Sequence, residues 1–246
     1  LSIATLLLLP FAARRSSELQ RLPRRGWRLA LLSGIVLGLH FAGYISSLRY
    51  TSIAAATVLA TSTPIWVGLA APLLLGERLN RYAVTGLALA LTGGAAIGLG
   101  SGGTGSHPLL GNGLALSSAI TGAIYLLIGR DLRPRLSLVS YTLIVYGMAA
   151  LTLLALTLLT GQPVFGYPAQ LYLLCLLMAL FPQLLGHSSY NYALAFLPVA
   201  YVSIAVISEP VGASLLGWLL FGEVPGLATA FGGALIVTGV LLASRT

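Results

Sequence analysis

The feature that most constrains this chain is a series of unbroken apolar segments, each long enough to cross a lipid bilayer. A spanning helix needs about 20 apolar residues. Only 7% of the 246 residues are charged and 57% are hydrophobic, whereas an average soluble domain carries about 25% charged residues. A soluble fold is therefore excluded. Spanning β-strands would alternate apolar and polar residues, which these segments do not, so the spans are helices.

The apolar segments predict a partial span over 1–13 followed by eight full spans, which makes the chain an all-α polytopic membrane protein. The full spans are expected at 29–48, 53–75, 82–100, 109–129, 136–160, 170–194, 199–221 and 226–243.

The arginines set the expected orientation of these spans. All 13 basic residues are arginine, and alternation through the spans places every one of them except Arg49 on the same side. This asymmetry follows the positive-inside rule. We therefore expect the arginine-rich side and the C-terminus to be cytoplasmic. We interpret the cluster from Arg14 to Arg28 as an anchor for lipid headgroups, not as a nucleic-acid site.

The residue inventory excludes several chemistries. Without lysine the chain can build neither a P-loop nor a pyridoxal Schiff base. Cys175 is the single cysteine, which excludes an internal disulfide or a thiolate cluster. The three histidines, His40, His107 and His187, lack metal-ligand spacing. We therefore expect no metal and no cofactor.

Two segments of the chain align without a gap, each position of the second lying 146 residues after its partner. Pro64 pairs with Pro210, and Gly76-Glu77 pairs with Gly222-Glu223. The paired spans cross the membrane in opposite directions, so each complete repeat holds an odd number of spans, here five. An inverted 5+5 repeat is an architecture of alternating access, with the substrate site near the midplane.

This repeat predicts the domain organisation. The first repeat covers 1–100, an extracytoplasmic linker covers 101–108, and the second repeat covers 109–246. The same offset places the start of the first repeat upstream of Leu1, so we expect its first one and a half helices, by the usual span length, to be missing. The intact protein would have ten spans.

Glu209 is the residue most indicative of function, because it lies near the centre of span 199–221. A charge at that depth costs about 2.5–3.5 kcal/mol on insertion scales. The carboxyl group is protonated, paired with polar side chains, or faces a wet cavity where it meets a cationic substrate group. Glu209 is therefore a candidate for substrate binding and proton coupling, and the alternative is a hydrogen bond between helices. Pro210 and its counterpart Pro64 predict helix kinks.

Other polar side chains within the spans could line an aqueous pocket. His40 and Tyr44 share one helical face, as do His187 and either Tyr190 or Asn191. The alternative for each is hydrogen bonding between helices. The candidate substrate-binding residues are His40, Tyr44, Trp66, Gln183, His187, Tyr190, Asn191 and Glu209.

Glu77 and Glu223 end their spans on opposite sides of the membrane. A glutamate at a helix C-terminus opposes the helix dipole, so each needs a compensating partner. Arg78 and Arg81 are near Glu77 in sequence. We interpret both glutamates as interfacial or gating residues.

Two segments resemble an EamA domain of the drug/metabolite transporter superfamily. The matching motifs are Thr63-Pro64 with Gly76-Glu77-Arg78, and Ser208-Glu209-Pro210 with Gly222-Glu223. The resemblance covers essentially the whole chain. It implies a ten-helix inner-membrane carrier with both termini cytoplasmic, whose members commonly export amino acids and related metabolites with an ion gradient.

These observations together predict a secondary transporter that exports a small polar, amino-acid-like metabolite. A lipid or sugar-nucleotide carrier remains open within this class. A membrane scaffold or sensor is the second reading, and it would tolerate loss of Glu209. An intramembrane enzyme is the third, although the chain offers no nucleophile motif or paired acids. The spacing Gly34-x-x-x-Gly38 fits close helix packing inside the monomer or in a homodimer.

Overall fold

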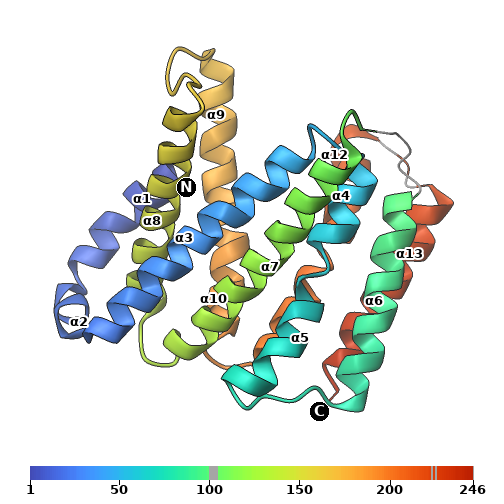
Figure 1. The fold of residues 1–246 in the computed structure, drawn as a ribbon, viewed down its shortest axis with the longest axis horizontal. Helices are drawn as coiled ribbons and strands as arrows, with labels where there is room; N and C mark the ends of the chain where they lie inside the picture. Colours follow the sequence, from blue (N-terminus) through green and yellow to red (C-terminus); the bar gives the residue numbers. More distant parts are fainter. Residues whose placement is uncertain (100–104, 223, 225, 246) are drawn as a thin grey trace. The chain divides into compact units, whose positions relative to one another are not determined.

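The computed structural model describes residues 1–99, 105–222, 224 and 226–245, and within these ranges the chain is helical with no strand (Figure 1). The helices are α1 (Ser2–Ala13), α2 (Ser16–Arg21), α3 (Arg24–Ser47), α4 (Ile53–Ala60), α5 (Thr63–Leu74), α6 (Arg81–Leu99), α7 (Pro108–Leu132), α8 (Leu138–Leu159), α9 (Ala169–Met178), the π-helix η1 (Ala179–His187), α10 (Ser188–Ala193), α11 (Val199–Val206), α12 (Glu209–Phe221) and α13 (Leu227–Ala243).

Six helical segments of the described chain are long and apolar enough to cross a membrane, as expected of a multi-pass membrane protein. They are Arg24–Ser47, Ala55–Leu74, Pro108–Leu132, Leu138–Leu159, Ala169–Ala193 and Val199–Leu220. Three apolar helices are shorter: Ser2–Ala13, Arg81–Ile97 and Leu227–Ala243. The last two fall where full spans were expected and reach only the lower limit of spanning length, so eight full spans stay a prediction.

The chain divides into two compact units. Unit 1 comprises Leu1–Ala42 and Ile124–Leu197, and unit 2 comprises Gly43–Ala123 and Pro198–Thr246. The boundaries fall inside α3 and α7, so each of these helices contributes to both units.

In unit 1, glycines allow helix α3 to approach α8 closely. A Cβ atom on Gly38 would lie 2.8 Å from the Cβ of Thr152, and one on Gly34 would lie 2.5 Å from the Cβ of Met148. Small residues at such contacts let helix backbones pack together. The Gly34-x-x-x-Gly38 spacing thus serves packing within the chain.

A glutamate on α2 holds the N-terminus of α8. One carboxylate oxygen of Glu18 accepts from the backbone N–H of Ser137 (2.5 Å). The other accepts from the hydroxyls of Ser137 (2.6 Å) and Ser140 (2.7 Å). Arg25 and Asp131 form an ion pair of 3.4 Å at the same end of unit 1. The arginines at 14–28 and those after α7 therefore gather at one end of this unit.

In unit 2, α6 and α13 lie side by side and antiparallel (Figure 1). A Cβ atom on Gly239 would lie 2.5 Å from the carbonyl oxygen of Gly86, and one on Gly232 would lie 2.5 Å from that of Gly93. Glycine is therefore required at both crossings. Around this contact the core of unit 2 is built from small and branched side chains, namely Ala83, Ala90, Ile204, Ile207, Ile236 and Ala243.

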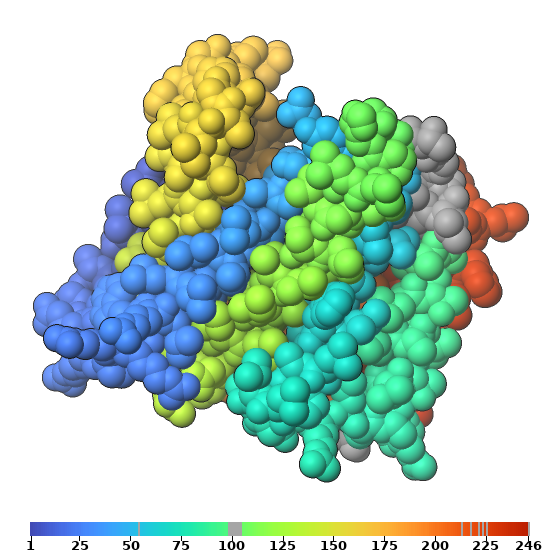
Figure 2. All heavy atoms as spheres, in the orientation of Figure 1, coloured from blue at the N-terminus to red at the C-terminus, as the bar shows by residue number. Residues whose placement is uncertain are grey.

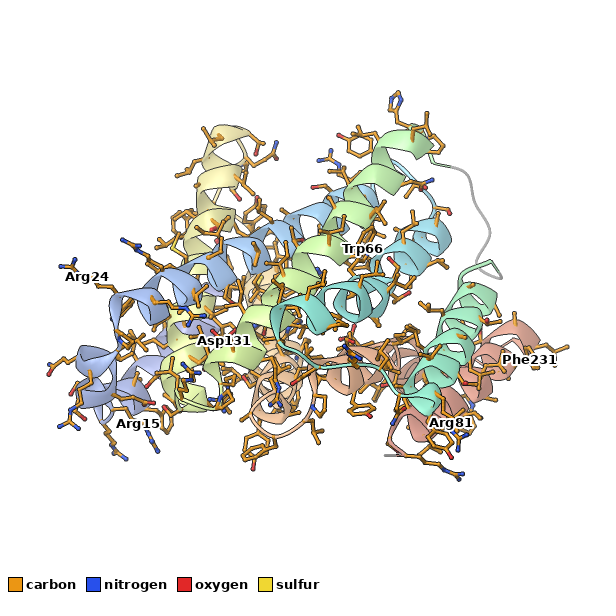
Figure 3. All side chains as sticks on the ribbon, turned by 60° about the horizontal axis from the view of Figure 1, so that its bottom comes forward. Arg15, Arg24, Trp66, Arg81, Asp131 and Phe231 are labelled. Carbon is orange, nitrogen blue, oxygen red and sulfur yellow. The ribbon has the colours of Figure 1, made fainter. Side chains whose placement is uncertain are left out.

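In unit 2 the arginines lie at both ends of the unit. The side-chain amide of Asn80 donates to the Tyr201 hydroxyl (3.2 Å) and to the carbonyl of Arg245 (3.4 Å), which brings the start of α6 and the C-terminal residues together. Arg81 lies at this end (Figure 3). Arg49 lies at the other end, next to Tyr50, whose carbonyl accepts from the backbone N–H of His107 (3.0 Å).

Replacing Gly232 or Gly239 with alanine should destabilise the protein by about 1–3 kcal/mol, because the added methyl group meets a backbone carbonyl that cannot move aside. Thermal unfolding of the purified protein measures the effect. Gly113→Ala is the matched control, since nothing lies within 4 Å of a Cβ built there. Equal unfolding temperatures for all three variants would contradict the close approach of α6 and α13.

The pH dependence of stability should report the Glu18 clamp. Burial raises the pKa of Glu18, but the hydrogen bonds from Ser137 and Ser140 outweigh it, and the net pKa lies below the ordinary 4.5. The stabilisation is therefore present above pH 4.5 and is lost as the pH falls through the lowered pKa. Glu18→Gln should cost about 1 kcal/mol at pH 7, the scale of a helix cap. The difference from the wild type should shrink in acid, and a pH-independent difference would argue against this clamp.

Candidate functional site

Unit 1 contains a buried hydrogen-bond network centred on the Tyr146 hydroxyl. This hydroxyl lies 3.1 Å from the hydroxyl of Ser188 and accepts from the side-chain amide of Asn191 (3.2 Å). The Tyr125 hydroxyl donates to the side-chain carbonyl of Asn191 (2.7 Å). Asn191 is fully buried, so this network fixes one face of α10 against α7 and α8. Asn191, predicted from the sequence to bind substrate, has its amide engaged within the protein.

The π-helix η1 places two other candidates, Gln183 and His187, in the same unit. Proline at position 182 lies inside this helix, and π-helical turns often occur at functional sites. Gln183 is 6% exposed. Among the described residues, neither Nε2 of Gln183 nor Nδ1 of His187 has a hydrogen-bond partner. Buried polar atoms without partners are costly, so a polar solute or water bound to these atoms would recover the missing hydrogen bonds.

Aromatic side chains surround His187. Its ring centroid lies 5.2 Å from that of Phe41, 5.8 Å from Tyr190 and 6.5 Å from Tyr125. The ring of His40 packs on Phe41 at 5.3 Å. Unit 1 thus brings the candidates His40, Gln183, His187, Tyr190 and Asn191 into one aromatic and polar cluster.

Sequence reasoning missed Phe41, Tyr125, Tyr146 and Ser188, which complete this cluster. The chain has 11 tyrosines, and a tyrosine in an apolar run is as typical of packing as of a polar network. Nothing in the local pattern distinguishes Tyr125 and Tyr146, because their partners come from other helices.

Unit 2 contains the remaining candidates. Trp66 lies on the first turn of α5, and its Nε1 atom is buried with no hydrogen-bond partner in the described part of the chain (Figure 3). Tyr44 lies on the last turns of α3, where its carbonyl accepts from the Ser47 hydroxyl (2.6 Å). Thr63 ties α5 to α7 by donating to the Ala119 carbonyl (3.3 Å).

Two of the expected spans are interrupted at corresponding positions. Between α4 and α5, the Ser62 hydroxyl donates to the Leu59 carbonyl (2.6 Å). Between α11 and α12, the Ser208 hydroxyl donates to the Ala205 carbonyl, also at 2.6 Å. A proline is the second residue of both following helices, where its missing N–H costs no helical hydrogen bond. Each serine hydroxyl thus satisfies a backbone carbonyl next to the break. Hydropathy alone does not reveal these breaks.

Glu209 is the first residue of α12 and its side chain is exposed in this unit. The N-terminus of a helix carries the positive end of the helix dipole, which favours a nearby negative charge. The break before α12 thus places an acidic group at a helix N-terminus in the middle of a predicted span. Discontinuous membrane helices of this kind occur in transporters.

Glu77 has a compensating partner that the sequence did not indicate. Its carboxylate accepts from the backbone N–H of Val199 (2.9 Å), at the start of α11. Pro198, the residue before α11, provides no side-chain cap. Glu77 follows Gly76, whose φ of +71° ends α5 in a conformation that favours glycine. Its predicted counterpart Glu223 lies outside the described residues.

No three His, Cys, Asp or Glu side chains of the described residues come together as a metal site. The described residues form a polar and aromatic cluster in unit 1 and interrupted helices in unit 2, and interrupted membrane helices are a feature of transport proteins.

Comparison with known families agrees with this class. The EamA-like transporter family matches residues 1–99 and 109–245. The chain therefore belongs to the EamA-like transporter family, and it is a transporter-family protein rather than an enzyme.

Several relatives carry transporter names. The pseudopaline exporter of Pseudomonas aeruginosa is 30% identical over 92% of this chain and 78% of its own length. A probable terminal-alkyne amino-acid exporter of Streptantibioticus cattleyicolor is 28% identical over 77% of this chain and 63% of its own length. An uncharacterized transporter of Archaeoglobus fulgidus is 27% identical over 83% of this chain and 72% of its own length. One crystal structure matches the fold with a TM-score of 0.81 and 24% identity, over 98% of this chain and 83% of its own.

Removing the Glu77 carboxylate should loosen the start of α11. We expect Glu77→Ala to increase hydrogen–deuterium exchange of the first amides of α11 by about tenfold, the equivalent of a helix cap of roughly 1.4 kcal/mol. Glu77→Gln, which keeps an acceptor oxygen, should have a smaller effect. The first amides of α8, capped by Ser137, are the internal control. Unchanged exchange at Val199 in the alanine variant would rule out this capping role.

Proposed function

We propose that the protein is a secondary transporter that exports a small polar, amino-acid-like metabolite by alternating access. The observation that carries this proposal is membership of the EamA-like transporter family together with the exporters among its relatives. Two relatives are named for what they export, a terminal-alkyne amino acid in one case and pseudopaline in the other. A chain without lysine cannot bind nucleotide through a P-loop, which favours ion-gradient drive.

The alternating mechanism would rest on the inverted 5+5 repeat, with 1–100 and 109–246 as its halves. The contacts between α6 and α13 support this repeat. With the offset of 146, Gly86 is equivalent to Gly232 and Gly93 to Gly239, and each glycine contacts the equivalent of the other. Reciprocal contacts of this kind are typical of a two-fold relationship. The matching φ of +71° at Gly76 and Gly222 also supports it.

Solute recognition would use the candidate residues named above. Glu209 would bind the ammonium group of the solute or carry the coupled proton. In unit 1, the partnerless Nε2 of Gln183 and Nδ1 of His187 would hydrogen-bond to polar atoms of a solute, and in unit 2 the Nε1 donor of Trp66 would do the same. Glu77 would act as an interfacial clamp. The arginine-rich ends and the C-terminus would face the cytoplasm, with the chain in the inner membrane.

The test is metabolite export from cells that overexpress the full-length natural protein, compared with Glu209→Gln at equal membrane level. We expect the wild type to enrich one class of amino-acid-like solute in the medium and Glu209→Gln to lower that export about tenfold or more, a loss of at least 1.4 kcal/mol in transition-state stabilisation.

Asp131→Asn is the matched control, because it makes the same carboxylate-to-amide change in an acid that pairs with Arg25. Export unchanged in Glu209→Gln would reduce Glu209 to a structural role. No enrichment with the wild type would favour import or the scaffold reading.

A further inference from the structure

One end of unit 1 contains a cavity outside the proposed transport residues. It has a volume of about 360 Å³ and lies between α2, the first turns of α3 and the turn that follows α7. The same segments lie beside one another on the molecular surface (Figure 2). The residues that decide its chemistry are Arg21, Arg25, Arg135, Leu22, Leu132 and Leu136.

The two acids of this cavity are engaged by the protein. Glu18 accepts three hydrogen bonds from Ser137 and Ser140. Asp131 pairs with Arg25 at 3.4 Å. The carboxylate oxygens of Glu18 are therefore occupied by α8 and Asp131 is paired with one arginine, so the lining holds three arginines against two engaged acids.

Two arginines of the cavity remain available to a ligand. Arg21 and Arg135 are exposed, and neither forms an ion pair with a described residue. A second hollow of about 510 Å³ adjoins the first through Ser17 and Glu18, and it adds Arg14 and Arg15. Figure 3 shows Arg15 and Arg24 extending outward from this end of unit 1. The region is thus electropositive and open to solvent.

The walls of the cavity are apolar below this charged rim. Leu132 and Leu136 are 6% and 4% exposed, and Leu22 and Leu29 complete the lining. A guanidinium group binds phosphate through paired N–H donors, whereas leucine side chains favour hydrocarbon. A small soluble anion would bind the guanidinium groups but would make no use of the leucine wall.

We propose that this cavity binds the headgroup phosphate of an anionic phospholipid, with Arg21 and Arg135 as the phosphate ligands and the leucine wall against the upper part of the acyl chains. Basic pockets between membrane helices are a recognised form of lipid-headgroup site. The site is separate from the proposed solute-binding residues, so it holds or fails independently of the transport proposal.

Native mass spectrometry of the purified protein tests the site. The probes are phosphatidylglycerol and phosphatidylcholine with identical acyl chains, and inorganic phosphate is the soluble competitor. We expect the wild type to retain phosphatidylglycerol preferentially, and Arg21→Gln with Arg135→Gln to lower that retention about tenfold or more. Millimolar inorganic phosphate should not displace the lipid.

Arg78→Gln with Arg81→Gln is the matched control, since it removes two arginines from unit 2 and should leave retention unchanged. Should the first double variant fail to fold, the wild type still decides: its preference for phosphatidylglycerol must weaken between about 0.05 and 0.5 M salt. Equal retention by both double variants, no preference over phosphatidylcholine, insensitivity to salt, or displacement by phosphate alone would each overturn the proposal.

Discussion

Every helix that starts in or near a membrane needs acceptors for its first backbone N–H groups, because lipid supplies none. Both units meet this need with a glutamate from another segment. Glu18 caps α8 in unit 1, and Glu77 caps α11 in unit 2. A carboxylate accepts hydrogen bonds from these donors, and its negative charge interacts favourably with the positive end of the helix dipole. These two contacts join segments more than a hundred residues apart, so they fix where α8 and α11 begin relative to α2 and α5.

The same requirement explains why the helix breaks at Ser62 and Ser208 are tolerated. Each serine turns its hydroxyl back to a carbonyl of the preceding helix, and the proline that follows has no N–H to satisfy. The break after Ser208 creates a new helix N-terminus within a span. Glu209 stands at that N-terminus, where a negative charge is less costly than inside a continuous helix.

Much of the fold could be predicted from the sequence because hydropathy depends on local residues. The expected span 82–100 and helix α6 (Arg81–Leu99), for example, differ by one residue at each end. The breaks at Ser62 and Ser208 could not be located, since proline predicts a kink but not a gap between helices. The sequence points to nearby arginines as partners of Glu77 and gives no sign of Val199, whose backbone N–H donates to the Glu77 carboxylate. The Tyr125–Asn191–Tyr146 network joins three helices, and no single segment contains its signal.

The positions of the acidic residues in the fold distinguish Glu209 from the other described acids. The chain has five acidic residues, and four of them lie in the described ranges. Glu18 and Glu77 cap helices, and Asp131 pairs with an arginine. All three lie at the arginine-rich ends of their units, where a charge costs less than near the middle of a span. Glu209 alone among the four lies near the middle of a spanning segment, Val199–Leu220, whereas Asp131 lies at the end of Pro108–Leu132. A carboxylate near the middle of a span costs about 2.5–3.5 kcal/mol of insertion energy. A cap or an ion pair at the membrane surface would serve folding at less cost, and this difference is the physical reason for proposing that Glu209 binds a solute or a proton.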